Sequence, residues 1–191
     1  MNLRRVVLVF AIFLNLSIFS QRQCDFAENV SDSTGTFKST KEFLFFERIF
    51  GQNEQYLYLN LNNEDGVPYV TVQYIQKNNQ FIKALCFDIN SKIHLQLENG
   101  KVVTFIHSNQ ETCGNYISQP EGKNVRVLAG NFLFLKNNLD ELKNSRVTMM
   151  RIKFGLESLN FTIKDELESE ALNKFFRPSS YFIEYLHCVL D

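Results

Sequence analysis

Apolar and polar residues alternate with a period of two along much of the chain, which predicts β-strands. The run at 43–50 (FLFFERIF) is apolar on both faces, whereas 56–61 (YLYLNL) places its leucines on one face. A return strand is expected at 69–75 (YVTVQYI), after a turn at 62–66 (NNEDG). The same reasoning predicts strands at 81–87, 125–135, 147–154 and 159–163.

Helical patterns are confined to the last third of the chain. We expect a short helix near 138–143 and another at 165–176, where acidic residues suit the start of a helix. Ser179 or Ser180 then precedes a last helix, whose apolar residues fall on one face. The fold class expected is therefore α+β, mainly antiparallel β hairpins and meanders, with two or three short helices toward the C-terminus.

One hairpin is predicted in detail. Asn99-Gly100 separates 92–98 (KIHLQLE) from 101–107 (KVVTFIH), and this dipeptide favours a two-residue type I′ turn. Residues whose numbers sum to 199 would then lie opposite one another, so that Ile93 faces Ile106.

The first 20 residues resemble a secretory signal peptide. Arg4 and Arg5 precede the apolar run 6–14 (VVLVFAIFL), and Ser20 is a small residue suited to cleavage. The alternative, an uncleaved anchor, would need roughly 20 apolar residues. We expect residues 1–20 to be removed and 21–191 to form a single β-rich globular domain, secreted or periplasmic, with no transmembrane segment in the mature chain.

The mature chain would contain four cysteines, an even number that suggests two disulfides in an exported protein. Three pairings are possible, and buried free thiols are the alternative. We favour Cys86 with Cys113, because the predicted hairpin brings its flanks together and its register places these two opposite one another. Cys24 and Cys188 lie near the mature termini, which often approach one another.

Composition and charge exclude several classes of protein. With 45% hydrophobic and 21% charged residues the chain is typical of a globular protein and argues against disorder. Loss of Arg4 and Arg5 leaves 18 basic against 21 acidic residues, a net charge of −3. No basic cluster remains along the sequence, so nucleic-acid binding is not expected.

His94 and His107 are the weak candidate metal ligands. The predicted register places both on one polar face, with Cα atoms about 7–8 Å apart, and a shared metal would need a third ligand. The alternative is two half-exposed histidines. His187 adjoins Cys188, but neighbouring helical residues point in different directions, so no Cys-His nucleophile is expected. Catalytic and cofactor-binding motifs are absent, and no cofactor is expected.

Two sequons, at Asn29 and Asn160, could carry glycans if the host glycosylates them. The turn at 62–66 superficially resembles a calcium loop, but Leu61 and Val72 fall where acidic ligands belong. The turn therefore predicts no calcium site.

Four parts of the mature chain resemble a group of small exported four-cysteine proteins of Bacteroidota, especially flavobacteria. The resemblance covers most of the mature chain. It implies export and the four-cysteine layout, and it implies no activity and no site residues. The parts that carry it are Cys24-Asp-Phe, 97–104 (LENGKVVT) with Cys113-Gly114, 142–147 (LKNSRV) with Arg151-Ile152, and 181–188 (YFIEYLHC).

The leading hypothesis is an exported, non-catalytic domain that binds another macromolecule or the cell envelope through a sheet face or loops. One alternative is a metal-dependent hydrolase that uses the His94/His107 face. A second alternative is a β-barrel that carries a small ligand in a large apolar cavity. A structure that shows which sheet face is uncovered would best distinguish these hypotheses.

Overall fold

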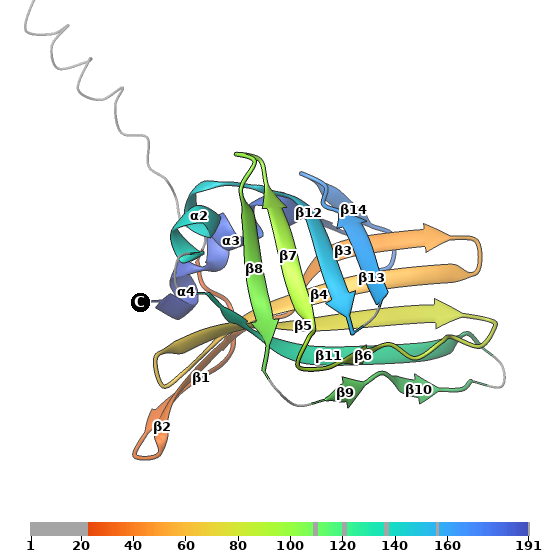
Figure 1. Cartoon of the computed structure of the whole chain (residues 1–191), viewed down its shortest axis with the longest axis horizontal. Helices are drawn as coiled ribbons and strands as arrows, with labels where there is room; N and C mark the ends of the chain where they lie inside the picture. The colour runs from red at the N-terminus through yellow and green to blue at the C-terminus, as the bar shows by residue number, and fades with distance from the viewer. Residues whose placement is uncertain (1–22, 109–110, 120–121, 136–137, 156, 191) are drawn as a thin grey trace, which may run out of the picture.

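Alternating sequences form long antiparallel strands, which dominate the computed structural model (Figure 1). The structure describes residues 23–108, 111–119, 122–135, 138–155 and 157–190, so the expected signal segment at 1–20 lies outside the described residues. The strands are β1 (Phe26–Asp32), β2 (Gly35–Thr40), β3 (Phe43–Phe50), β4 (Asn53–Glu64), β5 (Val67–Asn78), β6 (Cys86–Phe87), β7 (Lys92–Leu97), β8 (Val102–His107), β9 (Thr112–Cys113), β10 (Asn115–Ile117), β11 (Asn124–Phe134), β12 (Val147–Phe154), β13 (Glu157–Thr162), β14 (Leu167–Ser169) and β15 (Lys174–Phe176).

Eleven strands join in one antiparallel sheet, in the order β1-β2-β4-β5-β11-β8-β7-β12-β13, with β3 also paired to β4 and β10 to β11. The ladder between β11 and β8 has only three residue pairs, from Phe132 to Phe134. The sheet turns at this short ladder. Strands β8, β7, β12 and β13, which we name the front sheet, therefore cross in front of β3, β4, β5 and β11, the back sheet (Figure 1).

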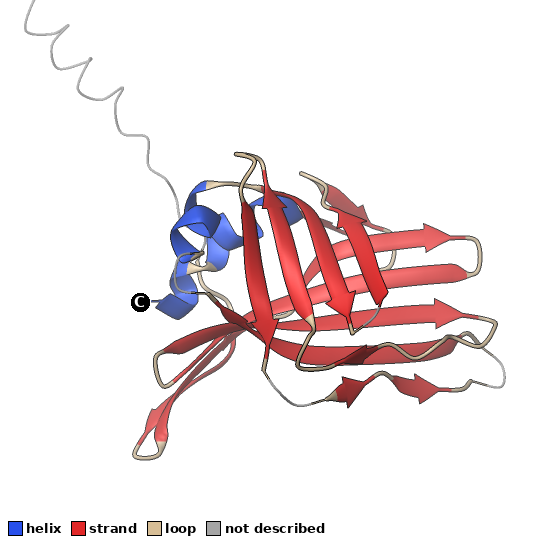
Figure 2. Cartoon of the chain, in the orientation of Figure 1, coloured by secondary structure: helices blue, strands red, loops and turns tan. Residues whose placement is uncertain are grey.

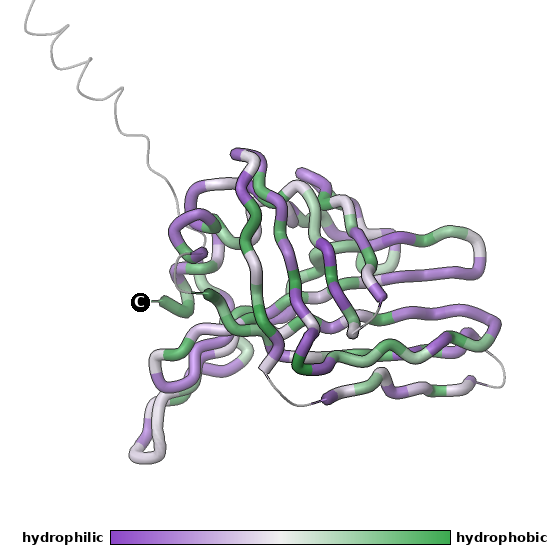
Figure 3. The backbone as a smooth tube through the Cα atoms, in the orientation of Figure 1, coloured by the Kyte–Doolittle hydropathy of each residue, from purple (hydrophilic) through white to green (hydrophobic). Residues whose placement is uncertain are grey.

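The core lies between the two sheets. Side chains that point inward from both layers, such as Leu59, Val72, Ile93 and Phe105, are completely buried. Figure 3 shows how hydrophilic and hydrophobic residues alternate along the front strands, which is why each strand has one buried face. Residues of both sheets thus contact one another in a single hydrophobic core.

A small helical part closes one end of the two layers (Figure 2). It comprises α2 (Leu139–Asn144), a 3-10 turn (Pro178–Ser180), α3 (Tyr181–Tyr185) and α4 (His187–Leu190). Phe182, Leu186 and Val189 are buried in the core, so the predicted apolar face of the last helical segment is confirmed. The expected architecture, mainly antiparallel β with few helices, is confirmed at this level.

The prediction of a helix at 165–176 is wrong. These residues form the hairpin β14–β15, whose partners include Leu167 opposite Phe176. Leu167 and Phe176 pack on the outer side of the back sheet, against Leu44 and Tyr56. Burial of these apolar residues in a second, smaller core outweighs the helical preference of the acidic segment.

Ahead of β3, the exposed hairpin β1–β2 extends away from the two layers (Figure 1). A strand was expected over the whole of 81–87, but only Cys86 and Phe87 are in a strand. The first residues of this segment are not in a strand, because the Ile82 carbonyl accepts a hydrogen bond from the Arg126 side chain instead of from a neighbouring strand.

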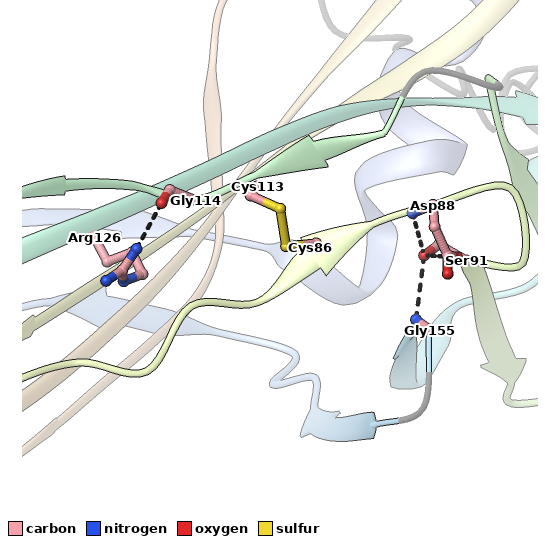
Figure 4. Close-up of a disulfide and its surroundings, with 7 residues drawn as sticks. All are labelled: Cys86, Asp88, Ser91, Cys113, Gly114, Arg126 and Gly155. Atoms are coloured by element: carbon pink, nitrogen blue, oxygen red, sulfur yellow. Dashed lines mark hydrogen bonds between the residues drawn. A yellow bond between two sulfur atoms is a disulfide. The ribbon is translucent and has the colours of Figure 1, made fainter.

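Both favoured disulfides are present. Cys86 bonds Cys113 within the two-stranded β6–β9 sheet, where the two residues lie directly opposite one another (Figure 4). Cys24 bonds Cys188 and so joins the segment before β1 to α4. The described residues contain no free cysteine.

The predicted register of the β7–β8 hairpin is wrong by one residue. Leu95 lies opposite Val103 and Ile93 opposite Phe105, so the numbers sum to 198. The loop contains three residues, in which the Gly100 amide donates to the Leu97 carbonyl and Gly100 alone has a positive φ, of 82°. This is a type I turn followed by a glycine bulge, the next most common hairpin loop after the two-residue turn.

Candidate functional site

The corrected register separates the two candidate histidines. A slip of one residue exchanges the two faces of a strand, so the inward-facing residues of β8 are Val103, Phe105 and His107. His107 is 5% exposed and lies against the rings of Phe87 and Phe132, while His94 points outward from β7. The two imidazoles therefore lie on opposite faces and cannot share a metal ion.

His107 has a structural environment. Its Nδ1 lies 3.1 Å from the carbonyl oxygen of Asp88. Burial lowers the pKa of His107, so the ring is neutral at pH 7 and Nδ1–H donates to that carbonyl. The Ser91 hydroxyl and the Asp88 carboxylate hold the same turn together beside Gly155 (Figure 4). The His107 ring thus anchors the 88–91 turn to the front sheet.

The outer face of the front sheet is open to solvent, since its outward side chains are exposed or half-buried. Cross-strand pairing arranges its outward side chains in three rows of four, because residues directly opposite one another on antiparallel strands share a face. We name this surface the basic face. Its rows are Ser158–Lys153–Lys92–Ile106, Asn160–Arg151–His94–Thr104 and Thr162–Met149–Gln96–Val102, each from β13 through β12 and β7 to β8.

Positive charge gathers on the basic face without acidic side chains. Lys92, Arg151 and Lys153 are exposed, and none of its three rows contains a carboxylate. Lys92 lies directly opposite Lys153, an arrangement of like charges that destabilises a sheet. In the described part of the chain neither lysine has a carboxylate within ion-pairing distance. An anion that binds here would offset this repulsion.

His94 occupies a central position on this face. Its Nδ1 lies 2.9 Å from the Thr104 hydroxyl, and it stands directly opposite Arg151. Burial lowers the pKa of His94, and the positive charges of Lys92, Arg151 and Lys153 lower it further. The imidazole is therefore neutral at pH 7. Its pKa depends on the charges of these three neighbouring side chains.

The polar side chains around the cations are neutral hydrogen-bonding groups. Arg151 donates from Nε to the Asn160 side-chain oxygen at 2.7 Å, and the Thr148 hydroxyl donates to the Gln96 carbonyl. None of the three rows contains Phe, Tyr or Trp, and the apolar members lie mainly along β8. The surface can therefore supply cations and amide or hydroxyl groups to a ligand, and His94 is the one ring in the rows on which a base could stack.

Sequence reasoning missed the basic face because its cations are distant in the sequence. The polar positions were visible, since Lys92, His94 and Gln96 alternate with core residues. Nothing in a single sequence showed that β12 lies beside β7, which places Arg151 opposite His94. The spatial cluster thus revises the expectation from the sequence, which contains no basic cluster along its length.

The remaining candidates give no metal centre. His187, Cys24 and Cys188 lie within 4.8 Å of one another, but both sulfurs are bonded in the disulfide, so the imidazole is the only free ligand. The same holds for Glu111 beside Cys86 and Cys113. The turn at 62–66 belongs to the β4–β5 hairpin, whose two-residue loop contains Asp65 and Gly66 at positive φ.

The two sequons lie on different surfaces. Asn29 is exposed on β1, whereas Asn160 belongs to the basic face and accepts the hydrogen bond from Arg151. A glycan on Asn160 would therefore cover the basic face, and a glycan on Asn29 would not.

Two open grooves flank the sheets. One, of about 380 Å³, is lined by Val67, Tyr69 and Leu133 together with Asp65. The other, of about 360 Å³, runs along β3 and contains Arg48 and Lys164 together with Glu168. Each groove contains both charged and apolar walls, and neither has the uniform charge of the basic face.

The fold and the uncovered face define a class of protein: a disulfide-bonded β domain with a cationic sheet face on a chain of net negative charge. Comparison with family models, with curated proteins and with solved structures finds no match to this chain. In the described residues, no helix has both the length and the apolar character needed to cross a membrane.

Proposed function

We propose that this protein is an exported, non-catalytic binding domain that holds an anionic polysaccharide on its basic face. The single observation that supports this most is the grouping of Lys92, Arg151 and Lys153 on an uncovered sheet face without a carboxylate in its rows. The electrostatic repulsion between Lys92 and Lys153 decreases when an anion binds beside them.

The chemistry of the face favours a carbohydrate over other polyanions. Single-stranded nucleic acid is bound through stacking of successive bases on several aromatic side chains, and His94 is the one ring in the rows. Protein partners usually cover a buried apolar centre, whereas the centre of this face contains His94, Arg151 and Lys92. Amide and hydroxyl side chains around the cations match the hydroxyl groups of sugars.

Export is part of the proposal. It is supported by the signal-like segment at 1–20, by the two disulfides and by the resemblance to exported four-cysteine proteins of Bacteroidota. Mass spectrometry of the native protein should find Gln21 as the first residue and four cysteines that resist alkylation. An intact Met1 with four alkylatable thiols would contradict export.

The binding test uses polygalacturonate, a carboxylated polysaccharide, with neutral dextran as the matched polymer. We expect the protein to bind polygalacturonate and not dextran in calorimetry, and to lose affinity as NaCl rises from about 50 mM to about 300 mM. The double variant Lys92→Gln/Lys153→Gln should weaken binding about tenfold or more, since it removes two of the three cations.

Lys143→Gln/Lys174→Gln is the control, because both lysines are exposed elsewhere and the change in net charge is the same. Equal loss of binding in the two double variants would overturn the assignment to the basic face. Equal affinity for polyglutamate or for single-stranded DNA would overturn the assignment to a polysaccharide.

A further inference from the structure

A groove of about 380 Å³ lies beside the place where the sheet turns from β8 into β11 (Figure 1). We name it the outer groove. A second hollow, of about 270 Å³, shares two of its lining residues and extends it along β5 to Thr71. The residues of the outer groove that the argument uses are Glu64, Asp65, Tyr69, Ser108, Asn131 and Leu133.

One cross-strand row joins the outer groove to the basic face. Tyr69 lies directly opposite Leu133, and Leu133 lies opposite Ile106. Ile106 in turn lies opposite Lys92, a cation of the basic face. Residues directly opposite one another share a face of the sheet, and three strand spacings place Tyr69 about 14 Å from Lys92 along the row. One extended polymer can therefore reach both surfaces.

Tyr69 and Leu133 form the apolar part of the groove. Each follows or precedes a core residue on its strand, Val70 and Phe132, so both side chains point away from the core. The Tyr69 ring is half-buried, and burial together with the negative charge of Glu64 raises the pKa of Tyr69. An aromatic ring in such a place offers an apolar surface with a polar end.

Hydrogen bonds fix the orientation of the Asn131 amide. The Asn62 side chain, which is 2% exposed, donates to the Thr71 hydroxyl at 2.9 Å. That hydroxyl donates to Asn131 Oδ1 at 2.7 Å, so the oxygen of the amide is already used. Within the described residues no group accepts from the Asn131 NH2, and the side chain is exposed. The amide therefore has a donor available for a ligand.

The charge of the outer groove is opposite to that of the basic face. Glu64 and Asp65 are carboxylates, which only accept hydrogen bonds, and Asp65 Oδ1 is held by the Thr36 amide at 2.8 Å. The ligand must therefore donate to them, and it must also accept from Asn131. Sugar hydroxyl groups do both, whereas an ammonium group only donates. The two carboxylates would repel an acidic sugar.

We propose that the outer groove binds a neutral sugar residue of the polysaccharide whose acidic residues lie on the basic face. This inference rests on the proposed function and narrows the ligand to a polymer that contains both acidic and neutral sugars. The sugar ring packs on Tyr69, its hydroxyls donate to Glu64 and Asp65, and one hydroxyl accepts from Asn131.

The test compares two oligosaccharides with three carboxylates each. Every residue of trigalacturonate is acidic, whereas glucuronate alternates with neutral N-acetylglucosamine in a hyaluronan hexasaccharide. We expect the hexasaccharide to bind about tenfold more tightly in calorimetry, since its neutral residues add hydrogen bonds. It should also shift the side-chain amide signals of Asn131 in NMR spectra, which trigalacturonate should leave unchanged.

Variants of the groove separate the two surfaces. Asn131→Ala removes the donor at an exposed position and should weaken binding of the hexasaccharide severalfold without changing that of trigalacturonate. Tyr69→Ala should act likewise, and Tyr69→Phe, which keeps the ring, should bind as the wild type does. Asn29→Ala, at an exposed position on β1, is the matched control. Lys92→Gln/Lys153→Gln should weaken binding of both oligosaccharides.

The outcomes distinguish this inference from the proposed function. Equal affinity of the wild type for the two oligosaccharides, or equal affinity of Asn131→Ala and wild type for the hexasaccharide, would overturn the outer groove alone. Tighter binding of a glucosamine hexasaccharide, which is cationic, would overturn the assignment to neutral sugars. Binding of neither acidic oligosaccharide would overturn the proposed function and this inference with it.

Discussion

At the scale of single residues, His94 is the titratable group on the basic face that changes charge near neutral pH. Its pKa lies below the ordinary value of about 6.5, since burial and three neighbouring cations disfavour the imidazolium. A bound polyanion cancels much of that repulsion and raises the pKa again. Protonation of His94 and binding of an anion are therefore linked.

The linkage predicts that affinity for polygalacturonate rises as the pH falls below the ordinary histidine pKa, because the complex then binds more protons than the free protein. We expect an increase of severalfold that His94→Gln abolishes, measured by calorimetry at constant ionic strength. The galacturonate carboxylates stay ionised in this range. An identical pH profile in the variant would contradict the role of His94.

The candidate residues show how far a single sequence leads. His94 was found on a polar face, which is where the structure places it, and half-exposed as the simpler hypothesis required. His107 was misplaced, because one residue of loop length in the β7–β8 hairpin decides which way its side chain points. The row Arg48–Gln55–Gln76–Arg126 could not be predicted either, since only the pairing of four strands places these residues in line.

At the scale of elements, the contact between β7 and β12 sets Lys92 directly against Lys153. Opposite charges in such positions stabilise a sheet by about 0.2–1 kcal/mol, and like charges destabilise it. The sheet therefore gives up some stability at the place where we propose that the ligand binds.

Lys92→Glu should raise the free energy of unfolding by about 1 kcal/mol, because it turns a repulsive pair into an attractive one. The same change should abolish polygalacturonate binding. Chemical denaturation and calorimetry on one preparation measure both effects. Lys143→Glu, at an exposed position in α2, is the control for the change in charge. A Lys92→Glu protein of lower stability would show that the pair is not repulsive.

Turns explain which elements could be predicted. Asp65-Gly66 forms the two-residue turn with both residues at positive φ, whereas Asn99-Gly100 belongs to a three-residue loop in which only Gly100 does so. Asp-Gly and Asn-Gly both favour a two-residue turn, yet here they belong to loops of two and three residues. The sequence alone does not distinguish the two lengths. β12, which alternates from Met149 onward, was predicted at its observed bounds, while the short hairpin β14–β15 depends on its contact with Leu44 and Tyr56.

At the scale of the whole molecule, the two disulfides constrain loops of very different length. Cys24 and Cys188 are 164 residues apart in the sequence, and Cys86 and Cys113 are 27 apart. The chain-entropy model assigns about 5 kcal/mol to the longer loop and about 3–4 kcal/mol to the shorter one. Most of the described chain lies within the longer loop.

Cys24→Ser/Cys188→Ser should therefore lower the Tm more than Cys86→Ser/Cys113→Ser does, and both variants should lower it relative to wild type. Differential scanning calorimetry of the oxidised proteins measures the order. Reduction of the wild type should bring its Tm below that of either variant. The reverse order of the two variants would show that local packing around the β6–β9 pair outweighs the length of the loop.

The covalent link between Cys24 and Cys188 also determines how the molecule responds to mechanical load. A force applied at these two residues passes through the sulfur–sulfur bond, so no tension reaches the sheets between them. A domain that is pulled through the chain segments next to these two cysteines would keep its fold for as long as that bond is oxidised.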